Sequence, residues 1–189
     1  MGCAKVILAS ASPRRRELMN MTGIPYEVDP ADVDEHTTLG AREAVAELSR
    51  RKAAAIAARH PGAIVIGSDT LVAIHDRALG KPVDEEDAFR MLRMLSGNTH
   101  QVYTGVTVIA ADGTVRTEVD VSHVTFAEIS DAEIRDYIAT GEPMDKAGAY
   151  AMQGLAGQWI AHVDGCPSGI IGLPVPLTVR LLREAGCSK

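Results

Sequence analysis

The chain has few aromatic residues and no excess of positive charge. Phe, Trp and Tyr together make up 4% of its 189 residues, and its formal net charge is −6. Proteins that hold single-stranded nucleic acid stack bases on aromatic side chains, and non-specific binding to nucleic acids or anionic membranes needs a basic surface. We therefore expect neither a nucleic acid nor a membrane as a partner. The hydrophobic fraction of 46% is typical of a globular protein with a mainly aliphatic core.

Long apolar runs and paired cysteines are also lacking. No stretch approaches the ~20 apolar residues of a membrane-spanning helix. The short run 6–9 precedes arginines instead of following them, unlike a secretory signal. The three cysteines, Cys3, Cys166 and Cys187, show no CxxC spacing and are interpreted as incidental. A sparse, odd number of cysteines is typical of a reducing compartment, which predicts a cytoplasmic protein.

Several common catalytic motifs are missing. Gly80-Lys81 is followed by proline, so there is no GxxxxGK[ST] phosphate-binding loop, and neither GxGxxG nor GxSxG occurs. The six histidines show no HxxxH spacing, which argues against a structural zinc site. A chain of this kind that handles phosphate would belong to the nucleotide hydrolases or transferases of other folds.

The most informative segment is LASASPRRR, residues 8–16. Ser12 is a favourable N-cap and Pro13 suits the first helical position, so a helix should begin here with three arginines in its first turn. The helix macrodipole disfavours cations at that end, whereas free backbone N–H groups and guanidinium groups together bind phosphate well. The alternative is a solvated basic patch. In an acidic chain, the cluster favours a small anionic ligand over a long polyanion.

The alternation of apolar and turn residues predicts an α/β fold with a mixed sheet. The segment 145–157 is rich in Gly and Ala and is expected to be a loop that lets backbone approach closely. Strands are expected at 5–9, 63–70 with a continuation to 74, 102–110, 115–124 and 158–163, and helices at 13–21, 41–59, 84–95, 131–140 and 174–184.

Asp69 is the first candidate for chemistry. We expect it at the C-terminal end of a buried parallel strand, a favoured functional position in α/β proteins. Its neighbours Gly67, Ser68 and Thr70 are small and leave room for a ligand. A carboxylate placed there could hold Mg²⁺ or Mn²⁺, or take a proton from an attacking water. The alternative is an aspartate that caps the turn after the strand.

Lysines supply further cations. Lys52, Lys81 and Lys146 are each, taken alone, more typical of solvated surface groups. Together with Arg14 and Arg15 they could surround a polyphosphate, but the sequence does not show that they converge.

Eight short blocks, in order along nearly the whole chain, resemble the Maf family of nucleoside triphosphate pyrophosphatases. Any one block is weak, whereas the ordered set is specific. The blocks are LASASPRR at 8–15, KA at 52–53, GSDT at 67–70, GKP at 80–82, LSGNTH at 95–100, YTGV at 103–106, DKAGAY at 145–150 and GLP at 172–174.

This resemblance implies one domain over residues 1–189. It implies an elongated, two-lobed mixed sheet flanked by helices, with a central substrate cleft like that of the inosine triphosphate pyrophosphatases. The implied reaction cleaves a nucleoside triphosphate to the monophosphate and pyrophosphate with a divalent cation, Mg²⁺ or Mn²⁺. The resemblance is also compatible with a homodimer, although no residue pattern demonstrates one.

The resemblance also assigns roles to residues. Asp69 matches the catalytic proton acceptor, and Asp69 with Glu35 would hold the metal. The groups around the phosphates match Ser10, Arg14, Arg15, Lys52 and Lys81, of which the two lysines are counted with Asp69 as catalytic. Arg16 has no such match and is expected at the surface.

Three positions bear on substrate choice. Arg14, Thr70 and Gln153 match residues of the subfamily that acts on dTTP and UTP, whereas a subfamily similar to 7-methyl-GTP pyrophosphatases tends to have Trp, Gln and Glu there. The Gln153 amide can donate to and accept from a uracil-type edge at once. The alternatives are a purine or 7-methyl-GTP house-cleaning pyrophosphatase, and a nucleotide-binding regulator of cell division and septum formation. Gly169 departs from the asparagine that the family often has at this place.

Overall fold

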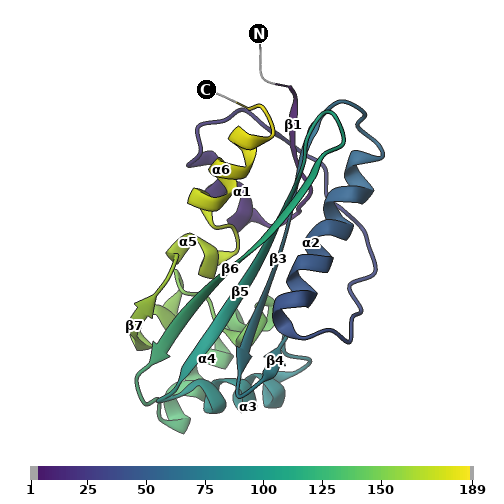
Figure 1. Cartoon of the computed structure of the whole chain (residues 1–189). Helices are drawn as coiled ribbons and strands as arrows, with labels where there is room; N and C mark the ends of the chain where they lie inside the picture. The colour runs from purple at the N-terminus through teal and green to yellow at the C-terminus, as the bar shows by residue number, and fades with distance from the viewer. Residues whose placement is uncertain (1–3, 188–189) are drawn as a thin grey trace.

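The computed structural model describes residues 4–187 and shows a mixed α/β fold built on one sheet (Figure 1). Strand β1 is parallel to β2 and β3, and every other pairing is antiparallel. The strands, in their order across the sheet, are β2 (Glu27–Val28), β1 (Val6–Leu8), β3 (Ile64–Ile74), β5 (Thr99–Ile109), β6 (Val115–Phe126) and β7 (Ile160–Asp164), with β4 (Arg77–Leu79) paired to β3. The predicted mixed sheet is confirmed.

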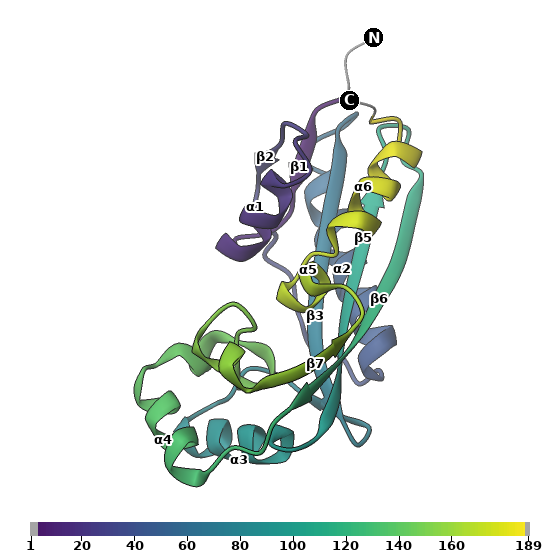
Figure 2. The ribbon, with the colours of Figure 1, turned by 90° about the vertical axis from the view of Figure 1, so that its left-hand side faces the viewer.

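Three long strands, β3, β5 and β6, run through two lobes (Figure 2). We call the part near both chain ends the upper lobe and the opposite part the lower lobe. The upper lobe contains α1 (Pro13–Asn20), α2 (Ala41–Ala57), α5 (Pro167–Ile171) and α6 (Val175–Glu184). The lower lobe contains α3 (Glu85–Leu95), α4 (Asp131–Ala139) and the 3₁₀ turns η1 (Glu142–Asp145), η2 (Ala147–Ala149) and η3 (Leu155–Trp159).

Each lobe has its own packed core. In the upper lobe, α1 and α6 bury Met19 and Leu181 against one sheet face, and α2 buries Ile56 against the other. The lower lobe holds most of the scarce aromatic residues, including Phe126 and Trp159. The few aromatic residues therefore gather mostly in the lower core, whereas the upper core is mainly aliphatic.

Helix starts follow the sequence signals. The Ser12 hydroxyl accepts from the N–H of Arg15 at 3.4 Å, and Asp84 Oδ1 accepts from the N–H of Asp87 at 2.8 Å. Ser130 and Glu133 form the reciprocal capping box at the start of α4. These side chains satisfy backbone donors that the first helical turn leaves without partners.

Three features differ from the sequence expectation. Strand β3 continues to Ile74, as expected, but Asp69 therefore lies in mid-strand instead of at a strand end, and the parallel pairing with β1 ends three residues earlier at Ile66. The short helix α5 was not expected, and the loop that follows Asp145 contains the turns η2 and η3. The local pattern cannot reveal where a neighbouring strand stops, because that is set by the partner.

The cysteines are not all incidental. Cys166 is free and half-buried, whereas Cys187 is disulfide-bonded, and Cys3 lies outside the described residues. Within residues 4–187, no helix is long and apolar enough to cross a membrane.

A buried histidine makes the stability of the lower lobe pH-dependent. His100 shares a hydrogen bond of 2.7 Å with the hydroxyl of Tyr150 and packs edge-on against Phe126. Burial lowers the pKa of His100 to about 4, whereas an unfolded chain would give about 6.5. The unfolded state therefore binds more protons between these pH values. We expect the free energy of unfolding to fall by up to about 3 kcal/mol as the pH drops from about 6.5 to about 4.

Urea unfolding across this pH range checks the expectation. His100→Phe keeps an aromatic ring in the cluster and removes the titrating group, so its stability should depend less steeply on pH over the same interval. Equal slopes for the two proteins would contradict it.

Candidate active site

The cleft forms where strand β3 has a partner on one side only. Strand β1 pairs with β3 as far as Ile66, and the pairing of β3 with β4 begins at Val72. Between them, residues 67–71 pair with β5 alone among the described strands, so side chains from both sheet faces reach one cleft of about 780 Å³. All nine residues proposed from the sequence line it, namely Ser10, Arg14, Arg15, Glu35, Lys52, Asp69, Thr70, Lys81 and Gln153.

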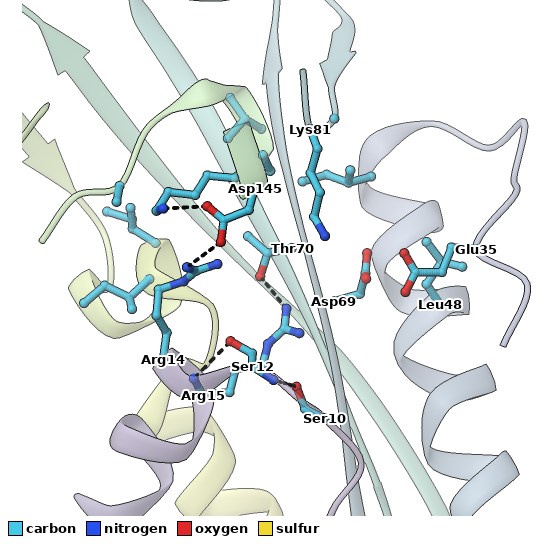
Figure 3. Close-up of a pocket in the computed structure, with 18 of the residues that line it drawn as sticks. Ser10, Ser12, Arg14, Arg15, Glu35, Leu48, Asp69, Thr70, Lys81 and Asp145 are labelled. Carbon is cyan, nitrogen blue, oxygen red and sulfur yellow. Dashed lines mark hydrogen bonds and ion pairs between the residues drawn. The ribbon is translucent and has the colours of Figure 1, made fainter. Parts of the chain in front are cut away.

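A buried lysine joins two carboxylates on the α2 side of the sheet. The ammonium of Lys52 donates to Asp69 Oδ1 at 2.7 Å and lies 2.8 Å from Glu35 Oε1. Lys52 and Asp69 are only 8% and 7% exposed, whereas Glu35 comes from the exposed segment before α2 (Figure 3). A charged group so deeply buried needs a partner. Separating the Lys52–Asp69 pair would leave two buried charges without a partner, and this cost stabilises the contact.

The two carboxylates have different proton affinities. Burial raises the pKa of Asp69, against the opposing charges of Lys52 and Arg15. Burial also acts to raise the pKa of Glu35, but the hydrogen bond and charge of Lys52 outweigh it and hold that pKa below its ordinary value. Asp69 is thus the stronger base of the two, and Glu35 remains ionised as its companion.

Two glycines let α2 approach closely enough for Lys52 to reach Asp69. A Cβ on Gly67 would overlap the carbonyl oxygen of Ser49 and lie 2.8 Å from the Ala53 nitrogen. A Cβ on Gly105, directly opposite Asp69 on β5, would overlap the carbonyl oxygen of Val45. The helix backbone therefore rests on the sheet where side chains are absent.

Arg15, from α1, lies against the other face of β3. Arg15 Nε donates to the carbonyl of Gly172 at 2.8 Å. Its Nη2 donates to the Thr70 hydroxyl at 3.2 Å (Figure 3). Burial lowers the pKa of Arg15, yet a guanidinium group stays charged in proteins. Nearby, the buried Ser10 hydroxyl accepts from the N–H of Ser12 at 3.2 Å. Arg15 is thereby fixed in position before any ligand arrives.

The wall formed by the lower lobe contributes Asp145, which was not predicted as a site residue from the sequence. Its carboxylate lies 4.0 Å from Arg14 and 2.7 Å from the ammonium of Lys146. The signal was present, because Asp145 opens the DKAGAY block. Lys81, from the loop after β4, points into the cleft (Figure 3) and is near enough to help lower the pKa of Glu35.

Two further residues lie as the sequence suggested. Gln153 is exposed and lines the cleft from the loop before η3. Arg16 is exposed and bonds to the carbonyl of Ala11 at 3.1 Å, outside the cleft lining.

The donor set fits a cation that is shared with a ligand. Within residues 4–187, no group of three or more His, Cys, Asp or Glu side chains could hold a metal by itself. Asp69 and Glu35 nevertheless converge on one positive charge, the Lys52 ammonium. Magnesium is commonly bound by one or two carboxylates together with substrate phosphates, so these two residues fit such an ion.

Gly169 replaces the asparagine expected from the family, and the structure shows what occupies the space. A Cβ on Gly169 would overlap the carboxylate of Asp120 on β6. Burial raises the pKa of that carboxyl. The Gly169 carbonyl in turn accepts from the buried Thr104 hydroxyl at 2.7 Å. The Asp120 carboxylate thus occupies the space that a side chain at residue 169 would need, and the Gly169 carbonyl supplies the polar contact there.

The fold and the cleft together define a mixed α/β protein whose cleft is lined by several arginine and lysine side chains. The family described as Maf-like protein matches residues 5–185, and the chain belongs to this family.

Relatives agree over nearly the whole length. The dTTP/UTP pyrophosphatase of Koribacter versatilis (strain Ellin345) is 48% identical over 183 residues, which cover 96% of this chain and 94% of the relative. The dTTP/UTP pyrophosphatase of Anaeromyxobacter dehalogenans (strain 2CP-C) is 46% identical over 187 residues, with coverage of 96% and 94%. The Staphylococcus aureus Ham1 protein is 15% identical, with a TM-score of 0.55 over 95% of this chain and 98% of that one. This last likeness concerns the fold alone and supports the predicted architecture.

Proposed function

We propose that the protein is a nucleoside triphosphate pyrophosphatase that converts dTTP and UTP to the monophosphate and pyrophosphate. The observation that carries the proposal is the buried Lys52–Asp69 pair, which opens into the same cleft as Arg14 and Arg15. The names of the two relatives support the substrate choice, and both share nearly half of their residues with this chain.

In the proposed reaction, a water molecule attacks the α-phosphorus. A bond forms between the water oxygen and that phosphorus. The bond from the α-phosphorus to its bridging oxygen breaks, and its electron pair leaves with pyrophosphate. Asp69 takes the water proton, a task to which its raised pKa suits it. Lys52, Lys81, Arg14 and Arg15 would offset the negative charge that develops on the phosphoryl oxygens.

We also propose that Asp69 and Glu35 hold Mg²⁺ or Mn²⁺ together with the substrate phosphates. A bound divalent cation would offset phosphate charge and lower the pKa of a coordinated water. Lys52 would then keep both carboxylates oriented through its two contacts of 2.7 and 2.8 Å.

Product analysis tests the proposed function. The purified protein is incubated with dTTP, UTP, CTP, ITP, XTP and 7-methyl-GTP, with added Mg²⁺ or Mn²⁺ and with a chelator. Phosphorus NMR then identifies the products. We expect pyrophosphate from dTTP and UTP, and none when the metal is removed. Orthophosphate as the first product would overturn the scheme. Faster cleavage of ITP, XTP or 7-methyl-GTP would indicate a purine enzyme, and stoichiometric binding without turnover would indicate a regulator.

The arginine triplet offers a matched pair of variants. Arg14 lines the cleft beside Asp145, whereas Arg16 is exposed and bonds to its own loop. Arg14→Ala should raise KM for dTTP about tenfold or more and change kcat less, because it removes a cation that positions the phosphates and leaves the base intact. Arg16→Ala should leave both constants unchanged. Steady-state kinetics of the two variants measures both constants. Equal effects would contradict the assignment of Arg14 to the substrate and of Arg16 to the surface.

A further inference from the structure

Two threonine hydroxyls form a series of hydrogen bonds that ends in the cleft. Thr70 on β3 and Thr104 on β5 are directly opposite each other, and their hydroxyl oxygens lie 3.0 Å apart. Thr104 is fully buried, and its hydroxyl donates to the carbonyl of Gly169 at 2.7 Å. A carbonyl oxygen can only accept, and a hydroxyl has one proton. The proton of Thr104 is therefore committed to Gly169.

The hydrogen bond from Thr104 to Gly169 fixes the direction of the hydrogen bond between Thr70 and Thr104. Because Thr104 has no second proton, it accepts from Thr70, so the Thr70 proton points away from the cleft. The guanidinium of Arg15, which can only donate, uses one lone pair of the Thr70 oxygen. One lone pair remains. Thr70 lines the cleft and can offer a ligand only an acceptor.

We propose that Thr104 is a positioning residue that holds Thr70 as a hydrogen-bond acceptor, so that the cleft selects a nucleobase presenting an N–H donor. The proposal rests on the proposed function and deepens it. Phosphate oxygens accept hydrogen bonds at neutral pH, so Thr70 is unsuited to them. Uracil and thymine share an imide N–H at ring position 3, where cytosine has a bare lone pair. An acceptor at this point therefore favours UTP and dTTP over CTP.

The 3′-hydroxyl of the sugar is the other donor that dTTP and UTP share. Of these two donors only the imide is absent from CTP, and the contact is assigned to the imide. A 3′-deoxy analogue of UTP separates the two sources, since it keeps the imide and lacks the sugar donor.

Binding of non-hydrolysable analogues tests the proposal without turnover. Titration calorimetry with α,β-methylene UTP and α,β-methylene CTP gives the UTP-to-CTP preference of each protein. In Thr104→Val the Thr70 hydroxyl has lost its acceptor and can turn its proton toward the ligand. We expect the preference to fall about tenfold or more. Thr104→Ser keeps the hydroxyl and should keep the preference.

The matched control is a second buried threonine on the same strand. Thr107 faces α2, and its hydroxyl lies 2.9 Å from those of Ser49 and Thr117, away from Thr70. Thr107→Val removes the same atoms and should not change the UTP-to-CTP preference. Thr104→Ala serves as a second variant that lacks the hydroxyl, in case the valine variant does not fold.

Three outcomes would overturn the proposal. The first is an unchanged UTP-to-CTP preference in a folded Thr104→Val or Thr104→Ala protein. The second is an equal loss of preference in Thr107→Val. The third is a loss of affinity for α,β-methylene 3′-deoxy-UTP as large as that for the CTP analogue, which would place the donor on the sugar. Failure of the proposed function is recognised separately, as absence of pyrophosphate release by the unaltered protein.

Discussion

Asp69→Asn is expected to lower kcat for pyrophosphate release from dTTP by about 10²–10⁴-fold, the range that a positioned general base contributes. The amide has nearly the same shape and can still accept from Lys52, whose ammonium lies 2.7 Å from the carboxylate oxygen. The variant loses the ability to take a proton, and it loses the negative charge that would help to hold the divalent cation. Steady-state kinetics measures the effect, and thermal unfolding shows whether the fold is retained. A folded variant with full activity would remove Asp69 from its proposed role.

The pH dependence gives an independent signature of the same residue. Burial raises the pKa of Asp69, so the group is protonated, and inactive as a base, up to a higher pH than an exposed aspartate. We expect kcat/KM to fall as the pH drops through this raised pKa and to be flat above it, as far as the other groups allow. The acidic fall should vanish from the residual activity of Asp69→Asn. Glu35→Gln should retain it, because the pKa of Glu35 is lowered.

Much of the fold could be predicted because its signals are local. Ser12 caps a helix as predicted, and the helices predicted at 84–95 and 131–140 begin at the capping side chains of Asp84 and Ser130. Capping and turn formation depend on a few adjacent residues, so a short stretch of sequence contains all that is needed. The prediction that Asp69 lies at the C-terminal end of a parallel strand was wrong for the opposite reason. Its setting depends on where β1 and β4 begin and end, which are distant parts of the chain.

That the site residues converge could be predicted only through the resemblance. Lys52 and Asp69 are 17 residues apart and belong to a helix and a strand. Nothing in their own neighbourhood shows that they meet, because their contact depends on how closely α2 lies on the sheet. The sequence does hold that information, in Gly67 and Gly105, but small residues in a strand acquire this meaning only once the helix is placed over them.

Gly67→Ala should therefore damage both stability and activity. The added methyl group would overlap the Ser49 carbonyl oxygen and press on the Ala53 nitrogen, which are backbone atoms of α2 and cannot rotate away. Accommodating it requires α2 to move outward from β3. Overpacking of this kind typically costs about 1–3 kcal/mol, which corresponds to a fall in Tm of roughly 3–10 °C for a protein of this size.

Activity is expected to fall further than the stability loss explains. Lys52 lies between Ser49 and Ala53 in sequence order along α2, so an outward shift of the helix draws its ammonium away from Asp69. A displacement of about 1 Å can cost about 100-fold in rate. Gly80→Ala is the stability control, because a Cβ there meets open space and Tm should be unchanged. If Gly67→Ala kept both its Tm and its kcat, close packing of α2 would not be what holds the Lys52–Asp69 pair together.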